Sequence, residues 1–235
     1  MSGNKRASAS VARAAVKALR AELGWTPSDL ISILRGGGSS SKGSGYEREL
    51  CGELSLWWTH GARDDIFWRS SGSGARAKVR GRRGADTHGQ HGDISATDPI
   101  GQPLIDMFTI EIKRGYSEHT IQDILDRLVT GGRQTYEDFL QQTIESSEQA
   151  GSYAWLMITR RDRRRAMVWF PMHVFATLRS VGAFPGGRPR PYFGMRATVR
   201  NNSNNGHDVD VCGMALEDFL GAVGPHHIIT MQEFA

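Results

Sequence analysis

The sequence predicts an α/β fold in which a mixed β-sheet is flanked by helices. Short apolar runs bounded by turn residues, such as those at 107–113, 154–158 and 167–170, are typical of strands. Apolar residues at helical spacing recur before and between these runs, in the stretches 46–60 and 135–144. A chain that runs helix, strands, helix, strands forms a layered α/β domain, and 235 residues suffice for its core.

Composition divides the chain into three expected parts. Residues 7–23 are predicted to form a helix, and Thr26-Pro27 is typical of the start of a second, short helix. The stretch 36–41 contains only glycine and serine, which indicates a flexible linker. We therefore expect an N-terminal helical arm and linker at 1–42, a core at 43–171, and a C-terminal α/β extension packed on the core at 172–235.

The core elements are expected in a definite order. After the helix at 46–60 and a strand at 65–69, the strands at 94–97 and 107–113 are expected to form one β-hairpin around a turn at 98–101. Ser117 is expected to cap a helix that runs through Leu128. The remaining expected elements are a helix carrying Tyr136, Phe139, Leu140 and Ile144, a hairpin of 154–158 and 167–170, helices at 172–180 and 215–223, and strands at 195–200 and 208–212.

The candidate chemistry lies on the strand Ile110-Glu111-Ile112-Lys113. Because side chains alternate across a strand, Glu111 and Lys113 point to one side while Ile110 and Ile112 face a core. Gly92-Asp93-Ile94 begins the preceding strand, so Asp93 is expected to converge with Glu111. Two carboxylates beside an ammonium suit a divalent metal and a phosphate, which favours a phosphodiester-cleaving nuclease.

A third acid lies on the helix at 46–60. Glu47 falls inside the apolar arc of this helix, whereas Glu49 and Glu53 fall outside it. A carboxylate on an apolar face costs free energy unless a metal or a lysine pairs with it. The alternative is that Glu47 sits at the N-terminus of the helix, where a carboxylate is favoured anyway. The residue alone does not decide between these two readings.

The expected roles follow from ligand chemistry. Asp93 and Glu111 supply hard oxygen ligands for Mg²⁺ or Mn²⁺, and Glu47 positions that ion or binds a second one. We count Ile112 with the metal-ligating positions. The metal lowers the pKa of a bound water, and Lys113 orients that water or offsets charge in the transition state. Gln134, at the start of the following helix, is a further candidate polar group.

The net charge of +4 and the pI of about 9.3 indicate only a modest excess of basic residues, but these residues are clustered in a few loops. Arginine-rich loops suit a polyanion such as DNA, and a charged hairpin tip reaches a phosphate backbone. The alternative is a solvated surface that binds nothing. The candidate DNA-binding residues in these loops are Arg76, Lys78, Arg80, Arg82, Arg83, Arg161, Arg163 and Arg164, with a further basic pair at Arg188 and Arg190.

Several other classes of protein find no support. Cys51 and Cys212 form neither a metal-ligand pattern nor a disulfide framework, which favours a reducing cytoplasm. No apolar run is long enough to span a membrane. His88 and His91 lie in a glycine-rich loop without a cysteine or a second spaced pair, unlike a zinc site. Trp57, Trp58 and Trp68 are expected to pack in the core rather than stack on bases.

Glu47, Asp93 and Glu111-x-Lys113 resemble the PD-(D/E)XK nuclease superfamily, with Gly92 where the motif has proline. The stretch Gly43-Ser44-Gly45-Tyr46-Glu47-Arg48 and the loop Ser71-Gly72-Ser73 are similar to archaeal-type Holliday junction resolvases. The resemblance covers about residues 43–170.

This resemblance implies a restriction-endonuclease-like core in which Glu47, Asp93, Glu111 and Lys113 are catalytic. It further implies that Ser71 contacts the scissile region, with Arg69 and Ser73 beside it on DNA, and that a homodimer acts on branched or duplex DNA in the cytoplasm of a bacterial, archaeal or phage-infected cell. Two alternatives stay open: a non-catalytic DNA-binding or assembly protein on the same fold, and a hydrolase of RNA or nucleotides.

Overall fold

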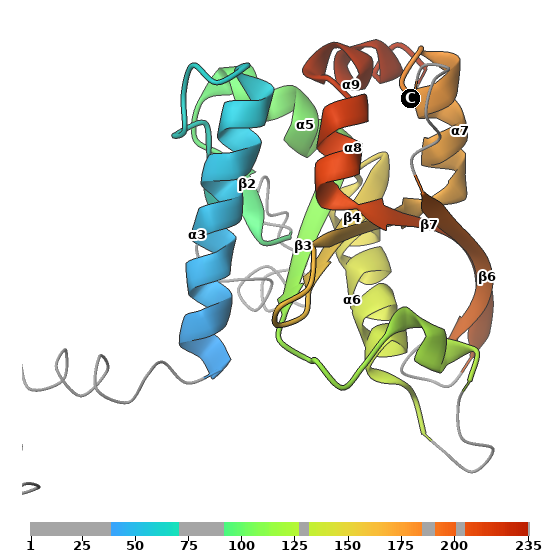
Figure 1. The fold of residues 1–235 in the computed structure, drawn as a ribbon. Coiled ribbons are helices and arrows are strands. Elements are labelled where there is room, and N and C mark those ends of the chain that lie inside the picture. The colour runs from blue at the N-terminus through green and yellow to red at the C-terminus, as the bar shows by residue number, and fades with distance from the viewer. Residues whose placement is uncertain (1–38, 71–91, 127–131, 185–190, 201–204, 235) are drawn as a thin grey trace, which may run out of the picture. The chain divides into compact units, whose positions relative to one another are not determined.

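Five strands form the central sheet of the computed structural model, in the spatial order β3-β4-β5-β7-β6 (Figure 1). The described residues are 39–70, 92–126, 132–184, 191–200 and 205–234. Residues 43–235 form one unit, distinct from residues 1–42. The flexible linker expected at 36–41 is wrong from Ser39 on, where α3 (Ser39–Trp58) begins, and the helices expected before it lie outside the described residues. The sheet strands are β3 (Phe108–Arg114), β4 (Ala154–Arg160), β5 (Met167–Pro171), β6 (Tyr192–Arg200) and β7 (Gly206–Ala215).

The sheet is mixed, as predicted. β3 and β4 run parallel, with Glu111 opposite Met157 and Lys113 opposite Thr159. All other neighbours are antiparallel, including the predicted hairpin of β4 and β5. The crossover between β3 and β4 contains α6 (Thr135–Ala150), because parallel neighbours need a long connection.

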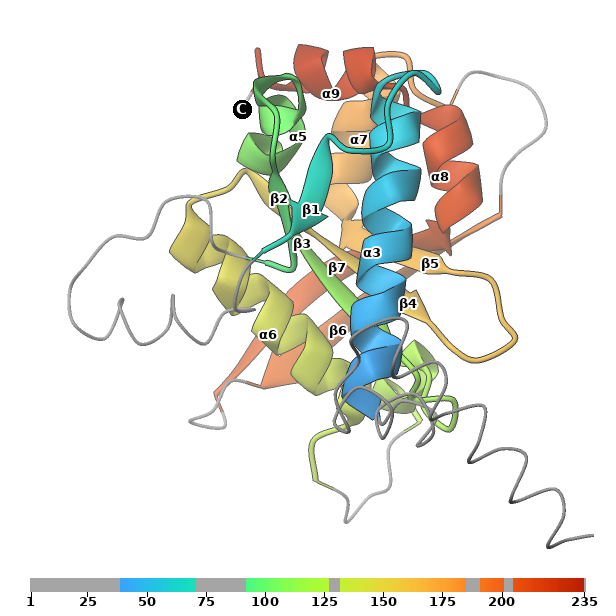
Figure 2. The ribbon, with the colours of Figure 1, turned by 90° about the vertical axis from the view of Figure 1, so that its left-hand side faces the viewer.

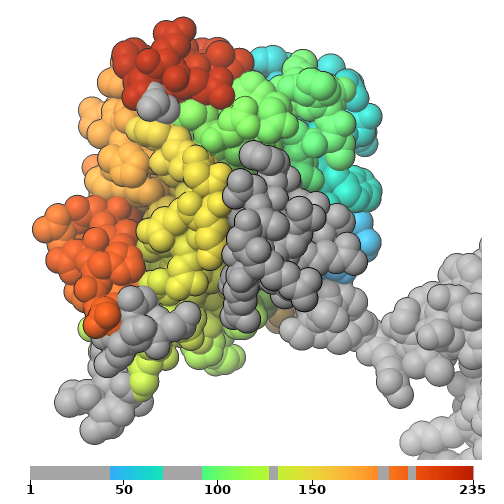
Figure 3. Space-filling model, turned by 180° about the vertical axis from the view of Figure 1, so that it is seen from behind, coloured from blue at the N-terminus to red at the C-terminus, as the bar shows by residue number. Residues whose placement is uncertain are grey.

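Helices cover both faces of the sheet. On one face, Ile110, Leu156 and Phe170 pack with apolar residues of α3 (Ser39–Trp58), α5 (Gln102–Met107), α7 (Met172–Ser180), α8 (Leu216–Ala222) and α9 (Pro225–Met231). On the other face, α6 packs against Trp155, Met157 and Trp169. Figure 3 shows this second face, with α6 in yellow beside the orange β6. The side chains of Glu111 and Lys113 belong to the α6 face.

The predicted hairpin of the Asp93 segment with β3 is wrong. β2 (Ile94–Ala96) pairs antiparallel with β1 (Phe67–Arg69), and α3 lies beside this two-stranded sheet (Figure 2). The segment 98–101 does not form a simple turn, because the side chain of Asp98 accepts the N–H of Ile100 at 3.0 Å and Pro99 starts a 3-10 helix, η1 (Pro99–Gly101). α5 follows directly and buries Leu104 and Met107.

The helix expected from Ser117 to Leu128 is also shorter than predicted. The structure has one 3-10 turn, η2 (Ile121–Ile124), which begins at Thr120 rather than at Ser117. The N–H of Thr120 donates to Asp123 at 2.9 Å, so this local bond fixes the start of the turn. Leu125 is exposed, and Leu128 lies outside the described residues.

The second half of the chain contributes to the same sheet. The helix predicted at 172–180 is confirmed as α7, and β7 inserts between β5 and β6. The helix α9 was not predicted. The division of the chain at residue 171 stays a prediction.

Tryptophan burial differs from the prediction at one position. Trp58 is buried and its indole N–H donates to the carbonyl of Ile100 at 2.7 Å, as expected for core packing. Trp68, in contrast, is 53% exposed. Both cysteines are buried and free. Within the described part of the chain, no helix combines the length and the apolar character needed to cross a membrane.

Candidate active site

Asp93 is bound to β3 by two hydrogen bonds. Its backbone N–H donates to the carbonyl of Ile110 at 2.7 Å, and its Oδ2 accepts the N–H of Ile112 at 2.8 Å. The carboxylate therefore replaces a neighbouring strand at the edge of β3. These contacts place it beside Glu111, which lies between the two residues that it binds.

Gly92 makes this approach possible. Its φ is +76°, and a Cβ at this position would lie 2.7 Å from the carbonyl oxygen of Ile110. Proline requires a φ near −65°, so it does not fit here. The glycine that stands where the superfamily motif has proline is thus required by the local backbone.

Glu111 and Lys113 form an ion pair on the α6 face of the sheet. Lys113 Nζ lies 3.0 Å from Glu111 Oε2, and both side chains are largely buried. Gln142 of α6 closes the group, since its Oε1 accepts from Lys113 Nζ at 3.1 Å and its Nε2 lies 3.5 Å from Glu111. The predicted alternation of this strand is confirmed.

The glutamine of α6 that contacts the Glu111–Lys113 pair is Gln142, which was not predicted. Gln134 is the N-cap residue of the helix, and its amide donates to the carbonyl of Gly132 at 3.1 Å. Gln142 lies about two turns further along and is the one that reaches the Glu111–Lys113 pair. The sequence offers only a weak signal for Gln142. It is a polar residue three positions after Phe139, on the helix edge next to β3.

The electrostatics of the site favour a bound cation. Burial, followed by the charge of Glu111, raises the pKa of Asp93 to about 7, while the bond from Ile112 and the charge of Lys113 act in the opposite direction. Two neighbouring carboxylates thus share one ammonium group. A divalent cation would supply the missing positive charge.

Glu47 pairs with Arg69, which is neither of the partners expected. α3 begins at Ser39, so Glu47 lies in its third turn and the alternative of a helix N-terminus is wrong. Arg69 Nε, on β1, donates to Glu47 Oε2. Burial, followed by the charge of Glu47, raises the pKa of Cys51 to about 12, with Asp93 contributing as well, so Glu47 and Asp93 lie around the same thiol.

The donor set fits magnesium or manganese. Among the described residues, Asp93 Oδ1 and Glu111 Oε1 have no hydrogen-bond partner. The same residues contain no cluster of three or more His, Cys, Asp or Glu side chains for a metal. Mg²⁺ does not need such a cage, because it keeps several waters and binds through one or two carboxylates plus substrate phosphates.

Ile112 contributes only through its backbone. Its side chain is buried in the apolar face, but its N–H points toward Asp93. Because the N–H and C=O of one strand residue face the same neighbour, its carbonyl oxygen lies on the same edge as the two carboxylates.

The other predicted residues fall into two groups. Arg161, Arg163 and Arg164 lie in the turn between β4 and β5 and line a separate cavity. The remaining candidates lie outside the described residues: Ser71, Ser73, Arg76, Lys78, Arg80, Arg82, Arg83, His88, His91, Arg188 and Arg190.

A mixed sheet whose first parallel strand carries Glu-x-Lys beside a partly buried aspartate is the arrangement of a PD-(D/E)XK nuclease. The chain belongs to the family described as "Phage putative PDDEXK endonuclease", whose model matches residues 38–230. No curated protein and no solved structure matches the chain.

Proposed function

We propose that this chain is a divalent-metal-dependent endonuclease that hydrolyses phosphodiester bonds of DNA. The observation that carries the proposal is the convergence of Asp93 and Glu111, from two different segments of the chain, next to the ammonium group of Lys113. Membership of a phage endonuclease family agrees with it.

Each side chain has a role that follows from its contacts. Asp93 and Glu111 would hold Mg²⁺ or Mn²⁺ through their free oxygens, and the ion would lower the pKa of a bound water and offset phosphate charge. Lys113 keeps Nζ near Glu111 and donates to an attacking water or a non-bridging phosphate oxygen. Gln142 holds both side chains in place from α6.

Glu47 acts on the metal site indirectly. Its pair with Arg69 ties α3 to β1, the strand that pairs with the segment after Asp93. We propose that Glu47 positions the metal site, and that Arg69 exchanges this carboxylate for a DNA phosphate when the substrate binds.

The substrate and the assembly are inferred from motif resemblance. We propose a homodimer that prefers branched DNA, such as a four-way junction, and that acts in the cytoplasm of a phage-infected cell. The resemblance of residues 43–48 and 71–73 to junction resolvases supports this part, and Ser71 and Ser73 are its candidate contacts.

The test is cleavage of a labelled four-way junction and of a linear duplex with matched sequence. Each reaction is run with Mg²⁺, Mn²⁺ or EDTA, for the natural chain, Lys113→Ala and Asp93→Ala. Arg165→Ala serves as the matched control, because Arg165 pairs with the surface residues Glu217 and Asp218.

We expect metal-dependent cleavage that both site variants lose by at least about 100-fold and that the control retains. Equal cleavage of the two substrates would keep the nuclease and remove the junction preference. Intact binding of DNA without cleavage in any metal would instead favour the non-catalytic alternative. Cleavage of RNA in place of DNA would favour the alternative of a hydrolase that acts on RNA or nucleotides.

A further inference from the structure

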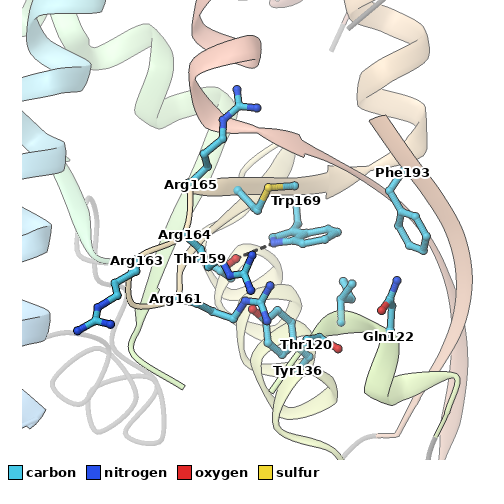
Figure 4. A pocket seen from close by; sticks show the side chains of 12 residues that line it. Thr120, Gln122, Tyr136, Thr159, Arg161, Arg163, Arg164, Arg165, Trp169 and Phe193 are labelled. Atoms are coloured by element: carbon cyan, nitrogen blue, oxygen red, sulfur yellow. Dashed lines mark hydrogen bonds between the residues drawn. The ribbon is translucent and has the colours of Figure 1, made fainter. Parts of the chain in front are cut away.

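A cavity of about 570 Å³ lies on the α6 face, apart from the Asp93 site. Figure 4 shows it between the β4–β5 turn, η2 and strands β5 and β6. Its volume is within the range of about 300–1,000 Å³ that is usual for small-molecule sites.

Aromatic rings form the floor and one wall of this cavity. Trp169 is almost fully buried, and its indole N–H donates to Thr159 Oγ1 at 2.9 Å. The ring lies directly over Gly213 of β7, where a Cβ would come within 2.2 Å of it. Tyr136 continues the floor, and the half-buried Phe193 of β6 stands across the opening.

The mouth of the cavity is cationic. Figure 4 shows the guanidinium groups of Arg161 and Arg164 directed into the cavity, whereas Arg163 and Arg165 point away from it. Arg165 is already paired with acidic residues of α8. Arg161 and Arg164 have no acidic partner among the described residues. The two inward arginines are therefore available to an anion.

The cavity begins next to the candidate catalytic strand. Thr159, in its floor, is the register partner of Lys113 on the adjacent strand, so their backbones are about 4.8 Å apart. The ammonium group of Lys113 also lies 5.6 Å from the ring centre of Phe139, which packs against Tyr136 at 5.5 Å. A strand cut at Lys113 can thus place a neighbouring nucleotide in the cavity.

We propose that the cavity binds one unpaired nucleotide, with its base against Trp169 and Phe193 and its phosphate at Arg161 and Arg164. Stacking on aromatic rings accepts any base, and arginine forks match phosphate oxygens. That this nucleotide belongs to the DNA being cut rests on the proposed function. A free nucleotide has the same chemistry, and the experiment separates the two sources.

The test uses a single-stranded oligonucleotide that contains one 2-aminopurine, whose fluorescence falls when the base stacks. It is titrated with the full chain in EDTA, so that binding is read without cleavage. The variants are Phe193→Ala and the double variant Arg161→Ala/Arg164→Ala. The double variant Arg165→Ala/Arg196→Ala is the matched control, because it removes the same charge from two arginines that already pair with acidic side chains. Thermal unfolding verifies that each variant is folded.

We expect quenching in the natural chain, affinity at least tenfold weaker in Arg161→Ala/Arg164→Ala, and quenching lost in Phe193→Ala. The control should lose no more than a few-fold in affinity and keep the full quenching. If free dAMP displaces the probe at concentrations similar to those of an unlabelled oligonucleotide, the ligand is a free nucleotide. If the oligonucleotide displaces the probe and dAMP does not, the ligand is a DNA strand.

Equal weakening by the two arginine pairs, or quenching that survives Phe193→Ala, would overturn the proposal. Because the signal is recorded in EDTA, a chain that binds the probe in the cavity but never cleaves DNA would contradict only the proposed function. Cleavage without quenching would contradict only the nucleotide site.

Discussion

The carboxylate of Asp93 accepts the backbone N–H of Ile112, at 2.8 Å, in the middle of the strand that carries Glu111 and Lys113. With the bond from the Asp93 N–H to Ile110, this contact takes the place of strand pairing at that edge of β3. One side-chain oxygen is used for the architecture, and the other stays available beside Glu111.

Gly92→Ala should abolish cleavage and destabilise the fold. Its φ of +76° and the 2.7 Å approach of a Cβ to the Ile110 carbonyl oxygen oppose any side chain. We expect a loss of about 2–4 kcal/mol in the free energy of unfolding, measured by urea titration, and at least about 100-fold in cleavage. Gly151→Ala is the control: its φ is also positive, at +65°, but a Cβ there meets open space. It should cost about 1–2 kcal/mol and leave cleavage intact. Similar activity in the two variants would contradict the role of Gly92.

Asp93→Asn should stabilise the metal-free protein at high pH. The pKa of Asp93 is raised to about 7 by burial and by Glu111, whereas its value in the unfolded chain is about 3.9. A raised carboxyl pKa means that ionisation opposes folding, so this penalty is absent below about pH 4 and grows as the pH rises through 7.

The measurement for Asp93→Asn is thermal unfolding in EDTA from pH 5 to pH 8. We expect the stability gain of the variant to increase by about 2–3 kcal/mol between pH 5 and pH 8, with most of the increase below pH 7 and a plateau above it. Added Mg²⁺ should stabilise the natural chain and not the variant. Asp64→Asn, an exposed position, should show neither effect. A gain that is independent of pH would contradict the assignment to Asp93.

Glu47→Gln should slow cleavage while leaving DNA binding in place. The substitution removes the negative charge that pairs with Arg69 and that contributes to the raised pKa of Asp93. Loss of such an outer group typically lowers activity or metal affinity about 10–100-fold. Single-turnover cleavage over a range of Mg²⁺ concentrations measures it. Glu49→Gln, two residues along the same helix, removes a surface pair with Arg160 and should change cleavage less than twofold. Equal effects of the two changes would place Glu47 outside the site.

Arg200→Met should destabilise the protein far more than Arg196→Met on the same strand. Glu137 of α6 is fully buried, and it accepts from the Arg200 guanidinium at 2.9 Å and from the Arg200 N–H at 3.1 Å. Removing the guanidinium takes away a charged partner of this buried carboxylate, while the N–H groups of Arg200 and Gln134 still donate to it, so we expect a cost of about 3 kcal/mol. Arg196 pairs with the exposed Asp210, so its loss should cost less than about 1 kcal/mol.

The same pair should have a definite pH dependence. Burial alone would raise the pKa of Glu137, but the hydrogen bonds from Arg200 outweigh it and lower the pKa below its ordinary value. A lowered carboxyl pKa stabilises the fold above the unfolded value of about 4.3, and this stability is lost as the pH falls through the folded pKa. Urea denaturation should therefore show the difference between Arg200→Met and the natural chain shrinking in acid. A constant difference would contradict the role of the charge.

Local patterns in the sequence were enough to predict much of the fold. The apolar arc of the helix at 46–60 is buried at Tyr46, Leu50 and Leu54, and the hairpin around the arginine-rich turn is confirmed. The prediction failed where a single capping hydrogen bond decided where an element begins. At Asp98 and Thr120, capping bonds set the start of a 3-10 turn, and periodicity carries no information on such bonds.

The sequence by itself determined that Glu111 and Lys113 share one side of a strand, since alternation is a property of the strand alone. Only the tertiary structure decided that Asp93 is bound to β3 without a hairpin, that Arg69 is the partner of Glu47, and that Gln142 rather than Gln134 reaches the pair. It also decided that Trp169, Phe193 and the arginine turn enclose a cavity. These features depend on contacts between residues far apart in the chain, and such contacts are fixed by how helices and strands pack rather than by any local period.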